Sequence, residues 1–189
     1  MKNVILLHGQ PDKEEYYDPS EPSASNAHWF PWLQKQLLVS GKQAQTPEVP
    51  ECYELNWNVW KKEVERFELN QDTVLVGHST GGGFWIRYLS EHPQIKVGKL
   101  ILVAPWNDPF NEFGTDFFKY EIDADLAQRT GSIVILASKD DDKSIIATVE
   151  QLQNTINNVE VIWYEDKGHF TERSLGSKEF PELLKEILR

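Results

Sequence analysis

The sequence is short of cysteine and of basic residues, and both shortages narrow the class of protein. Cys52 is the single cysteine among 189 residues, so no internal disulfide can form and a reducing compartment is indicated. Lys and Arg number 19 against 30 Asp and Glu, which gives a formal net charge of −11. Because such a charge repels phosphate backbones and anionic lipids, we expect no nucleic-acid partner and no binding to membranes.

Long apolar runs and metal-binding motifs are also missing. The first apolar run, 4–7, ends at His8 and is far too short for a signal-peptide core or a membrane span, so we expect a cytoplasmic protein. One cysteine and scattered histidines form neither an H-x-x-x-H nor a C-x-x-C arrangement. The glycines at 81–83 lack the lysine of a phosphate-binding loop. We therefore expect no metal and no cofactor.

Length and apolar pattern together indicate the fold class. The chain has 189 residues, 40% of them hydrophobic, which is too short for two ordinary domains, so we predict a single domain over residues 1–189. Short runs rich in β-branched residues alternate with apolar stripes at helical spacing. This alternation predicts an α/β fold, with a mostly parallel sheet of about six strands covered by helices on both faces. The predicted strands are 4–7, 43–45, 73–76, 100–103, 133–137 and 159–164.

Apolar residues at helical spacing predict five helices between and after these strands. Gly41 suits the end of the first helix, because glycine readily adopts the left-handed conformation there. Asn56 is a candidate N-cap of the second helix, and Pro93 closes the third. The stripes are Phe30, Leu33, Leu37 and Leu38; Trp57, Trp60, Val64 and Phe67; Phe84, Trp85, Tyr88 and Leu89; Ile145, Val149, Leu152 and Ile156; and Phe180, Leu183, Leu184, Ile187 and Leu188.

Two segments depart from this alternation. Residues 10–28 are polar and rich in proline, so we predict a surface loop without regular structure. Residues 106–118 follow a strand directly and hold five aromatic residues. Insertions at the carboxyl ends of parallel strands are common ligand sites, so this segment is a candidate lid whose Trp106, Phe113 and Phe117 contact substrate. The alternative is a satellite cluster packed on a helix.

The motif Gly-His-Ser-Thr-Gly at 77–81 indicates a nucleophile. G-x-S-x-G is a weak pattern by itself, but here it follows a predicted strand and precedes a helical stripe. A sharp strand-to-helix turn presents the hydroxyl of Ser79 above the sheet, and the helix N-terminus favours negative charge at the same place. Ser79 is therefore the candidate nucleophile.

A serine nucleophile needs a base, and His169 occupies the required place. Of the five histidines, it alone follows the last strand by a short turn, next to Gly168. The base in turn needs a carboxylate, and three adjacent aspartates at 140–142 follow the strand 133–137. Asp141 falls between serine and histidine in the chain order of α/β-hydrolases, but order alone does not separate these aspartates. Asp108, after the preceding strand, is the remaining competitor.

Several segments carry a family resemblance. They are Gly-His-Ser-Thr-Gly at 77–81, Ala-Ser-Lys-Asp-Asp at 137–141, Lys-Gly-His-Phe at 167–170, His-Trp-Phe-Pro-Trp at 28–32, and the Arg87-Tyr88 pair. Together they resemble the small serine hydrolase family that includes retinoblastoma-binding protein nine. The resemblance implies a compact α/β-hydrolase fold, no cofactor, and a triad of Ser79, Asp141 and His169. Where the family commonly has proline after the triad aspartate this chain has Asp142, so the choice between Asp141 and Asp142 stays open.

An oxyanion hole of backbone amides completes the expected site. Thr80 follows the nucleophile and Gln10 lies in the loop after the first strand, so their N–H groups are the candidates, with His8 bracing that loop. The expected reaction is cleavage of a small or medium carboxylic ester or amide through an acyl-enzyme on Ser79. Peptidase and acyltransferase activity stay open. The alternative function is a non-catalytic module of the same fold that binds a protein partner.

Overall fold

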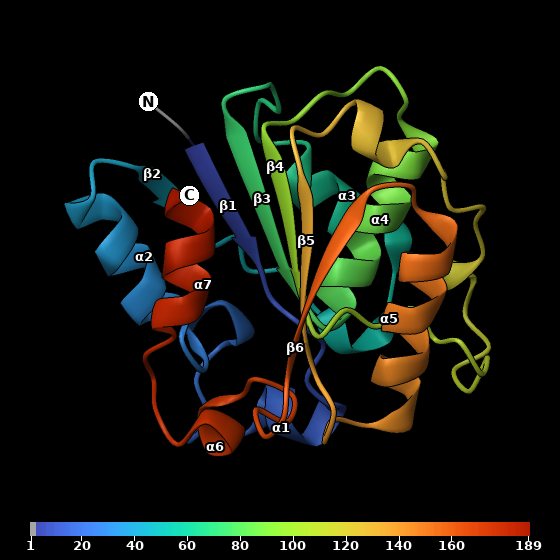
Figure 1. The fold of residues 1–189 in the computed structure, drawn as a ribbon. Coiled ribbons are helices and arrows are strands. Elements are labelled where there is room, and N and C mark those ends of the chain that lie inside the picture. The colour runs from blue at the N-terminus through green and yellow to red at the C-terminus, as the bar shows by residue number, and fades with distance from the viewer. Residues whose placement is uncertain (1–2) are drawn as a thin grey trace.

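The computed structural model describes residues 3–189, whose strands form one parallel sheet in the order β2-β1-β3-β4-β5-β6 (Figure 1). Neighbouring strands run parallel throughout; Leu6 pairs with Val76, and Gly77 with Leu102. The strands are β1 Asn3–Leu7, β2 Gln43–Gln45, β3 Thr73–His78, β4 Lys99–Val103, β5 Ile133–Ser138 and β6 Val159–Tyr164. The prediction of a six-stranded parallel sheet is confirmed.

Helices cover both faces of this sheet (Figure 1). The helices α2 and α7 lie on one face, and α3, α4 and α5 lie on the other. The bounds are α1 Lys13–Tyr17, α2 Phe30–Val39, α3 Trp57–Val64, α4 Thr80–Glu91, α5 Lys143–Thr155, α6 Glu172–Leu175 and α7 Pro181–Leu188. Within residues 3–189, no helix has both the length and the apolar character needed to cross a membrane.

The core lies between the sheet and these helices. Every residue of β3, β4 and β5 is buried, as expected for central strands covered on both faces. Because all six strands are parallel, the loops after them meet at one edge of the sheet. The loops that follow β1, β3, β4, β5 and β6 carry the candidate site residues to that edge.

Most of the predicted helix boundaries and stripes are confirmed. Gly41 has a φ of +74° just beyond α2, and the side chain of Asn56 accepts hydrogen bonds at the start of α3. Leu38 belongs to the predicted apolar stripe but not to the core, because it is 51% exposed. Leu33 and Leu37 are buried, and Leu38 lies one residue further around the helix, where it faces solvent.

The prediction of a structureless loop at residues 10–28 is wrong. The segment contains the helix α1 and a 3-10 turn, Ala24–Asn26. The side chain of Asp12 accepts from Glu15 N and caps α1 at its start. Because α1 is short and polar, it has no apolar stripe, and the periodicity of the sequence therefore did not reveal this helix.

The aromatic segment 106–118 is anchored at its carboxyl end. It is irregular except for a 3-10 turn, Asp116–Phe118. The guanidinium of Arg87 on α4 donates to the carbonyls of Asp116 and Phe117 at 2.7 and 2.8 Å and stacks over the Trp57 ring, 3.9 Å from its centroid. These contacts fix the end of the segment against α3 and α4.

Candidate active site

Ser79 lies in the turn between β3 and α4, and its backbone is strained. Its φ of 53° and ψ of −122° fall in a region that L-residues rarely adopt. The N–H of Ser79 donates to Val103 O at 2.9 Å, and its carbonyl accepts from Trp106 N at 3.0 Å. The side chain makes no capping bond to α4. The surrounding backbone therefore holds the turn, and the hydroxyl stays available for chemistry.

Close backbone contacts explain the glycines around this turn. A Cβ on Gly81 would lie 2.4 Å from His8 O, and a Cβ on Gly77 would lie 2.5 Å from Gly81 O. The loop after β1 also approaches the nucleophile, because a Cβ on Gly9 would lie 3.0 Å from Ser79 Cβ. The turn thus has the packing that the G-x-S-x-G motif predicts.

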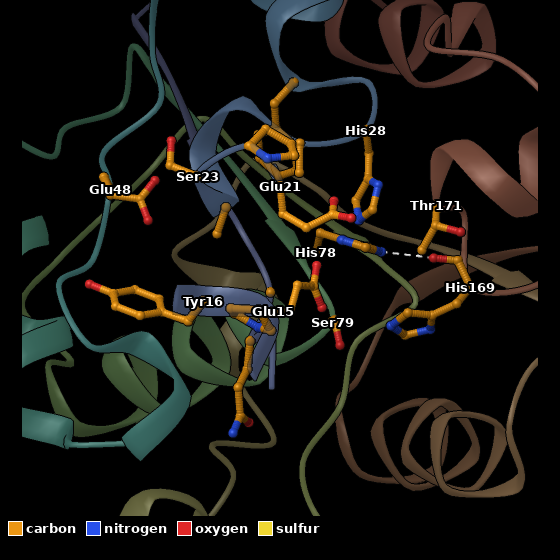
Figure 2. Close-up of a pocket in the computed structure, with 17 residues that line it drawn as sticks. Glu15, Tyr16, Glu21, Ser23, His28, Glu48, His78, Ser79, His169 and Thr171 are labelled. Carbon is orange, nitrogen blue, oxygen red and sulfur yellow. Dashed lines mark hydrogen bonds between the residues drawn. The ribbon is translucent and has the colours of Figure 1, made fainter. Parts of the chain in front are cut away.

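His169 lies in the loop after β6 and is oriented by a carboxylate. Its Nδ1 is 3.0 and 3.2 Å from the two carboxylate oxygens of Asp141. This contact makes Nδ1 the protonated nitrogen and leaves Nε2 to act as a base. Gly168, with a φ of +48°, lets the chain turn just before the histidine. Figure 2 shows the His169 ring beside Ser79, and both residues line the same cavity.

The four competing aspartates have different partners. Asp141 alone contacts His169, and its side chain is only 3% exposed. Asp140 accepts from the hydroxyl of a serine on β5 and from the amide just before His169. Asp142 caps α5, and Asp108 accepts two amides of its own loop. The geometry therefore brings Asp141, and none of the other three, to the imidazole.

The backbone amides of two residues near Ser79 are the candidate oxyanion donors. The N–H groups of Gln10 and Thr80 have no acceptor within residues 3–189. The Gln10 side chain donates to Tyr53 O at 2.9 Å. Both residues line a cavity together with Ser79. Unused donors beside a nucleophile suit an oxyanion hole.

His8 braces the loop that carries Gln10, as expected. Its Nε2 accepts from Val49 N at 3.0 Å, so its Nδ1 carries the proton and donates to Gly9 O at 2.6 Å. Burial lowers the pKa of His8, which keeps the ring neutral in this arrangement.

His78, inside the turn, has a role that the sequence did not reveal. Its Nε2 donates to His169 O at 2.8 Å, and the two rings lie 5.0 Å apart (Figure 2). Burial and the nearby His169 and His28 hold the pKa of His78 well below its ordinary range. The neutral ring therefore links the turn of Ser79 to the loop of His169.

Because His8 and His78 are neutral in the folded protein, we expect the protein to lose stability at acid pH. At pH values above 6.5 His8 and His78 are uncharged in both the folded and the unfolded chain. Below 6.5 the unfolded chain binds protons that the folded chain does not, so the free energy of unfolding should fall with falling pH. The slope approaches about 1.4 kcal/mol per pH unit for each histidine. Urea unfolding between pH 7 and pH 5 measures it.

The variant His78→Gln provides the control for this slope. Glutamine can still donate to the His169 carbonyl but cannot titrate, so the slope between pH 6.5 and pH 5 should fall by up to about 1.4 kcal/mol per pH unit. An identical slope in the variant and the wild type would contradict the assignment of His78, whatever the absolute stability of the variant.

Two cavities meet at Ser79 and His169. The first has a volume of about 540 Å³ and extends beneath α1 and the Ala24–Asn26 turn. The second has a volume of about 390 Å³ and lies toward α5 and the aromatic segment. Volumes of this size suit small organic ligands. The second cavity is lined by Gln10, Pro11, Asp12, Ser79, Thr80, Trp106, Phe113, Asp141, Asp142, Ser144, Ile145 and His169.

The three aromatic residues expected to contact substrate lie in different places. Trp106 and Phe113 line the second cavity, with their ring centroids 5.0 Å apart. Phe117 does not, and this expectation is corrected. It is 1% exposed and packs against the rings of Trp57 and Trp60, because the anchored end of its segment turns into the core.

One group of side chains in residues 3–189 brings three metal-ligating atoms together. The ligand atoms of His8, Glu48 and Cys52 lie within 4.8 Å of one another. Both nitrogens of His8 already take part in hydrogen bonds. Burial and Glu48 raise the pKa of the Cys52 thiol to about 12, which keeps it protonated. The donor set therefore does not suit a metal ion.

Comparison with known proteins identifies the family. The family model described as serine hydrolase matches residues 20–188. The chain belongs to the serine hydrolase family. YdeN of Bacillus subtilis is 29% identical over 183 residues, which cover 90% of this chain and 87% of YdeN. The resemblance found in the sequence is thereby confirmed, and membership of this family supports a hydrolytic function.

Solved structures show the same fold. The crystal structure of YdeN matches this serine hydrolase with a TM-score of 0.84 and 26% identity, covering 100% of this chain and 97% of that one. An esterase from Exiguobacterium antarcticum matches with a TM-score of 0.62 and 16% identity, covering 100% and 91%. The fold prediction, an α/β-hydrolase, is confirmed.

Proposed function

We propose that the protein hydrolyses a carboxylic ester or amide of a small to medium substrate, with Ser79, Asp141 and His169 as the catalytic triad. One observation carries this proposal. A strained serine and a histidine held by a buried aspartate line one cavity. A carboxylesterase is the favoured subtype, because an esterase is among the proteins that share the fold.

The reaction follows from the positions of these groups. His169 Nε2 takes the proton of Ser79 as the hydroxyl oxygen attacks the carbonyl carbon, and Asp141 stabilises the imidazolium that forms. The amides of Gln10 and Thr80 stabilise the oxyanion. The imidazolium then gives its proton to the leaving alcohol or amine, which leaves an acyl-enzyme. His169 then takes a proton from water as the water attacks the acyl carbon, and gives that proton to the Ser79 oxygen as the acyl bond breaks and the acid leaves.

A fluorophosphonate probe tests this function, because it reacts with an activated serine and ignores an idle one. We expect the intact protein to bind one phosphonyl group, on the peptide that contains Ser79. A well-folded protein that takes up no probe would overturn the proposal and favour the non-catalytic interaction module.

The second cavity predicts a specific effect of Phe113 on substrate choice. Its ring is 56% exposed and forms part of the apolar wall. Phe113→Ala should therefore lower the ratio of kcat/KM for a hexanoate ester to that for an acetate ester by roughly twofold to fivefold. Hydrolysis of a series of 4-nitrophenyl esters measures this ratio.

Two further variants distinguish side chains that line the substrate cavity from side chains that pack in the core. Phe110 is 55% exposed and does not line the cavity, so Phe110→Ala should keep the original ratio. Phe117→Ala should destabilise the protein by about 3–5 kcal/mol without a specific change in chain-length preference. If Phe113→Ala behaves like Phe110→Ala, residues 106–118 do not form a substrate wall.

A further inference from the structure

The first cavity at Ser79 is lined by acidic residues and by no Lys or Arg of the described chain. Glu15, Glu21 and Glu48 contribute its carboxylates, and they come from α1, from the loop after it and from the segment after β2. Figure 2 shows Glu48 and Tyr16 across the cavity from Ser79 and His169. Glu48 thus lies across the cavity from Ser79, where the remote part of a substrate would extend (Figure 2).

These carboxylates are not neutralised by the protein. Within residues 3–189, none of the three forms an ion pair with a Lys or an Arg. Burial and the neighbouring Asp12 and Glu21 raise the pKa of Glu15, as expected where like charges crowd together. A cation bound among them would lower the free energy of this arrangement.

Two features hold the acidic part in a defined shape. Glu48 Oε2 accepts from Ser25 N at 2.8 Å, which fixes that carboxylate, and its other oxygen has no donor among the described residues. The Tyr16 hydroxyl accepts from Glu51 N at 3.0 Å, so its ring stays on the cavity wall. An aromatic face next to carboxylates is a favourable surface for an organic cation.

The second cavity has a mainly apolar wall, formed by Trp106, Phe113 and Ile145. Three aspartates also line it, but each is already engaged: Asp141 contacts His169, Asp142 caps α5 and Asp12 caps α1. Ser79 and His169 line both cavities, so a carbonyl at the nucleophile lies between an acidic and an apolar compartment. The groups on the two sides of the scissile bond would thus contact different kinds of side chains.

We propose that the substrate of Ser79 is an ester or amide with an ammonium or guanidinium group on one side of the carbonyl and an apolar group on the other. The cation lies among Glu15, Glu21 and Glu48, and the apolar group lies against Trp106 and Phe113. This proposal rests on the proposed hydrolytic function. The site is the cavity at the nucleophile, and the carboxylates determine which substrate it selects.

Two pairs of esters matched in size test the proposal and show which side carries the cation. The first pair, 4-nitrophenyl 6-aminohexanoate and heptanoate, places the cation in the acyl group. The second pair, 5-aminopentyl and hexyl phenylacetate, places it in the alcohol. In one pair the cationic ester should have a kcat/KM roughly tenfold or more above its neutral partner. Added NaCl should reduce that advantage, because salt screens partly exposed charges.

Variants then test whether the cavity carboxylates cause the preference for cationic esters. Glu48→Gln should lower the ratio of cationic to neutral kcat/KM by roughly fivefold or more. The double variant Glu15→Gln/Glu21→Gln, at exposed positions that folding tolerates, should lower it in the same direction. Glu14 lies on α1 but does not line the cavity, so Glu14→Gln removes the same charge as a matched control and should keep the ratio.

The outcomes separate this proposal from the one on which it rests. Equal or lower kcat/KM for the cationic ester in both pairs, with Ser79 still labelled by fluorophosphonate, would overturn the substrate class and leave the hydrolase function standing. A preference that Glu14→Gln reduces as much as the cavity variants would also overturn it, because general attraction by net charge would then explain it. Loss of labelling in the wild type would instead overturn the hydrolase function.

Discussion

Replacing Ser79 by alanine is expected to abolish fluorophosphonate labelling and to lower ester turnover by roughly 10⁴- to 10⁶-fold. The hydroxyl is the only group at this position that can form the acyl bond, so no neighbouring residue can replace it. Folding should be unaffected, because the Ser79 side chain makes no capping bond to α4 and the strained turn is held by backbone contacts. Circular dichroism and urea unfolding check that the variant is intact.

A second serine in the same cavity is the matched control. Ser23 lines the first cavity with Ser79, so a probe that reacted with any accessible serine there would label it too. We expect Ser23→Ala to take up the probe as the wild type does. Labelling that survives in Ser79→Ala would show that another residue is the nucleophile.

Replacing Asp141 by asparagine should lower kcat by roughly 10³- to 10⁴-fold. The amide keeps the size of the side chain but removes the charge that orients Nδ1 and stabilises the imidazolium of His169. The backbone around this residue should be unchanged, so the loss should appear in turnover rather than in thermal stability. Steady-state hydrolysis of a 4-nitrophenyl ester measures the loss.

The neighbouring aspartates provide matched controls with the same change. Asp142→Asn should leave kcat within about twofold, because asparagine caps a helix almost as well as aspartate. Asp140→Asn keeps an oxygen that can accept the hydrogen bonds from β5 and from the loop of His169, so its effect should also be small. A large loss confined to Asp142 or Asp108 would move the catalytic role to that residue.

The strands and the strand-to-helix turn that carries Ser79 could be predicted from local sequence. The central strands β3, β4 and β5 are buried on both faces, and the turn at Ser79 needs glycine at 77 and 81, where a Cβ would lie within 2.5 Å of backbone atoms. The position of His169 followed from its place after the last strand. These features depend on neighbours in the sequence, so a single chain was enough to find them.

One of the three aspartates at 140–142 is the N-cap of α5, and recognising that cap would have narrowed the choice of the triad acid. Asp142 precedes the apolar stripe that begins at Ile145, which is the usual place of an N-cap, and its side chain accepts from Ser144 N. Assigning Asp142 to the cap would have left Asp140 and Asp141. The orientation of those two depends on the turn after β5, which no periodic pattern describes.

The acidic part of the cavity was missed for a different reason. Glu15 and Glu21 lie between β1 and α2, whereas Glu48 lies after β2, and scattered charges in polar loops are usually solvated. These residues line one cavity because of the position of α1, which has no apolar stripe. The path of residues 46–56 beside the loop after β1 also brings Glu48 to that cavity. Likewise, nothing local indicated that Phe117 turns into the core, since Arg87 fixes it from α4.

The acidic cavity also bears on how relatives of this enzyme could acquire new substrates. Most of its distinctive wall, including Glu15, Tyr16 and Glu21, comes from one uninterrupted stretch between β1 and α2. The residues of the proposed triad are carried by the distant loops after β3, β5 and β6. A change of that stretch alone, by insertion, deletion or exchange between relatives, alters what is recognised while the reacting groups keep their positions. Transplanting residues 11–27 into a related hydrolase, together with a glutamate at the position of Glu48, is therefore expected to transfer the proposed selectivity.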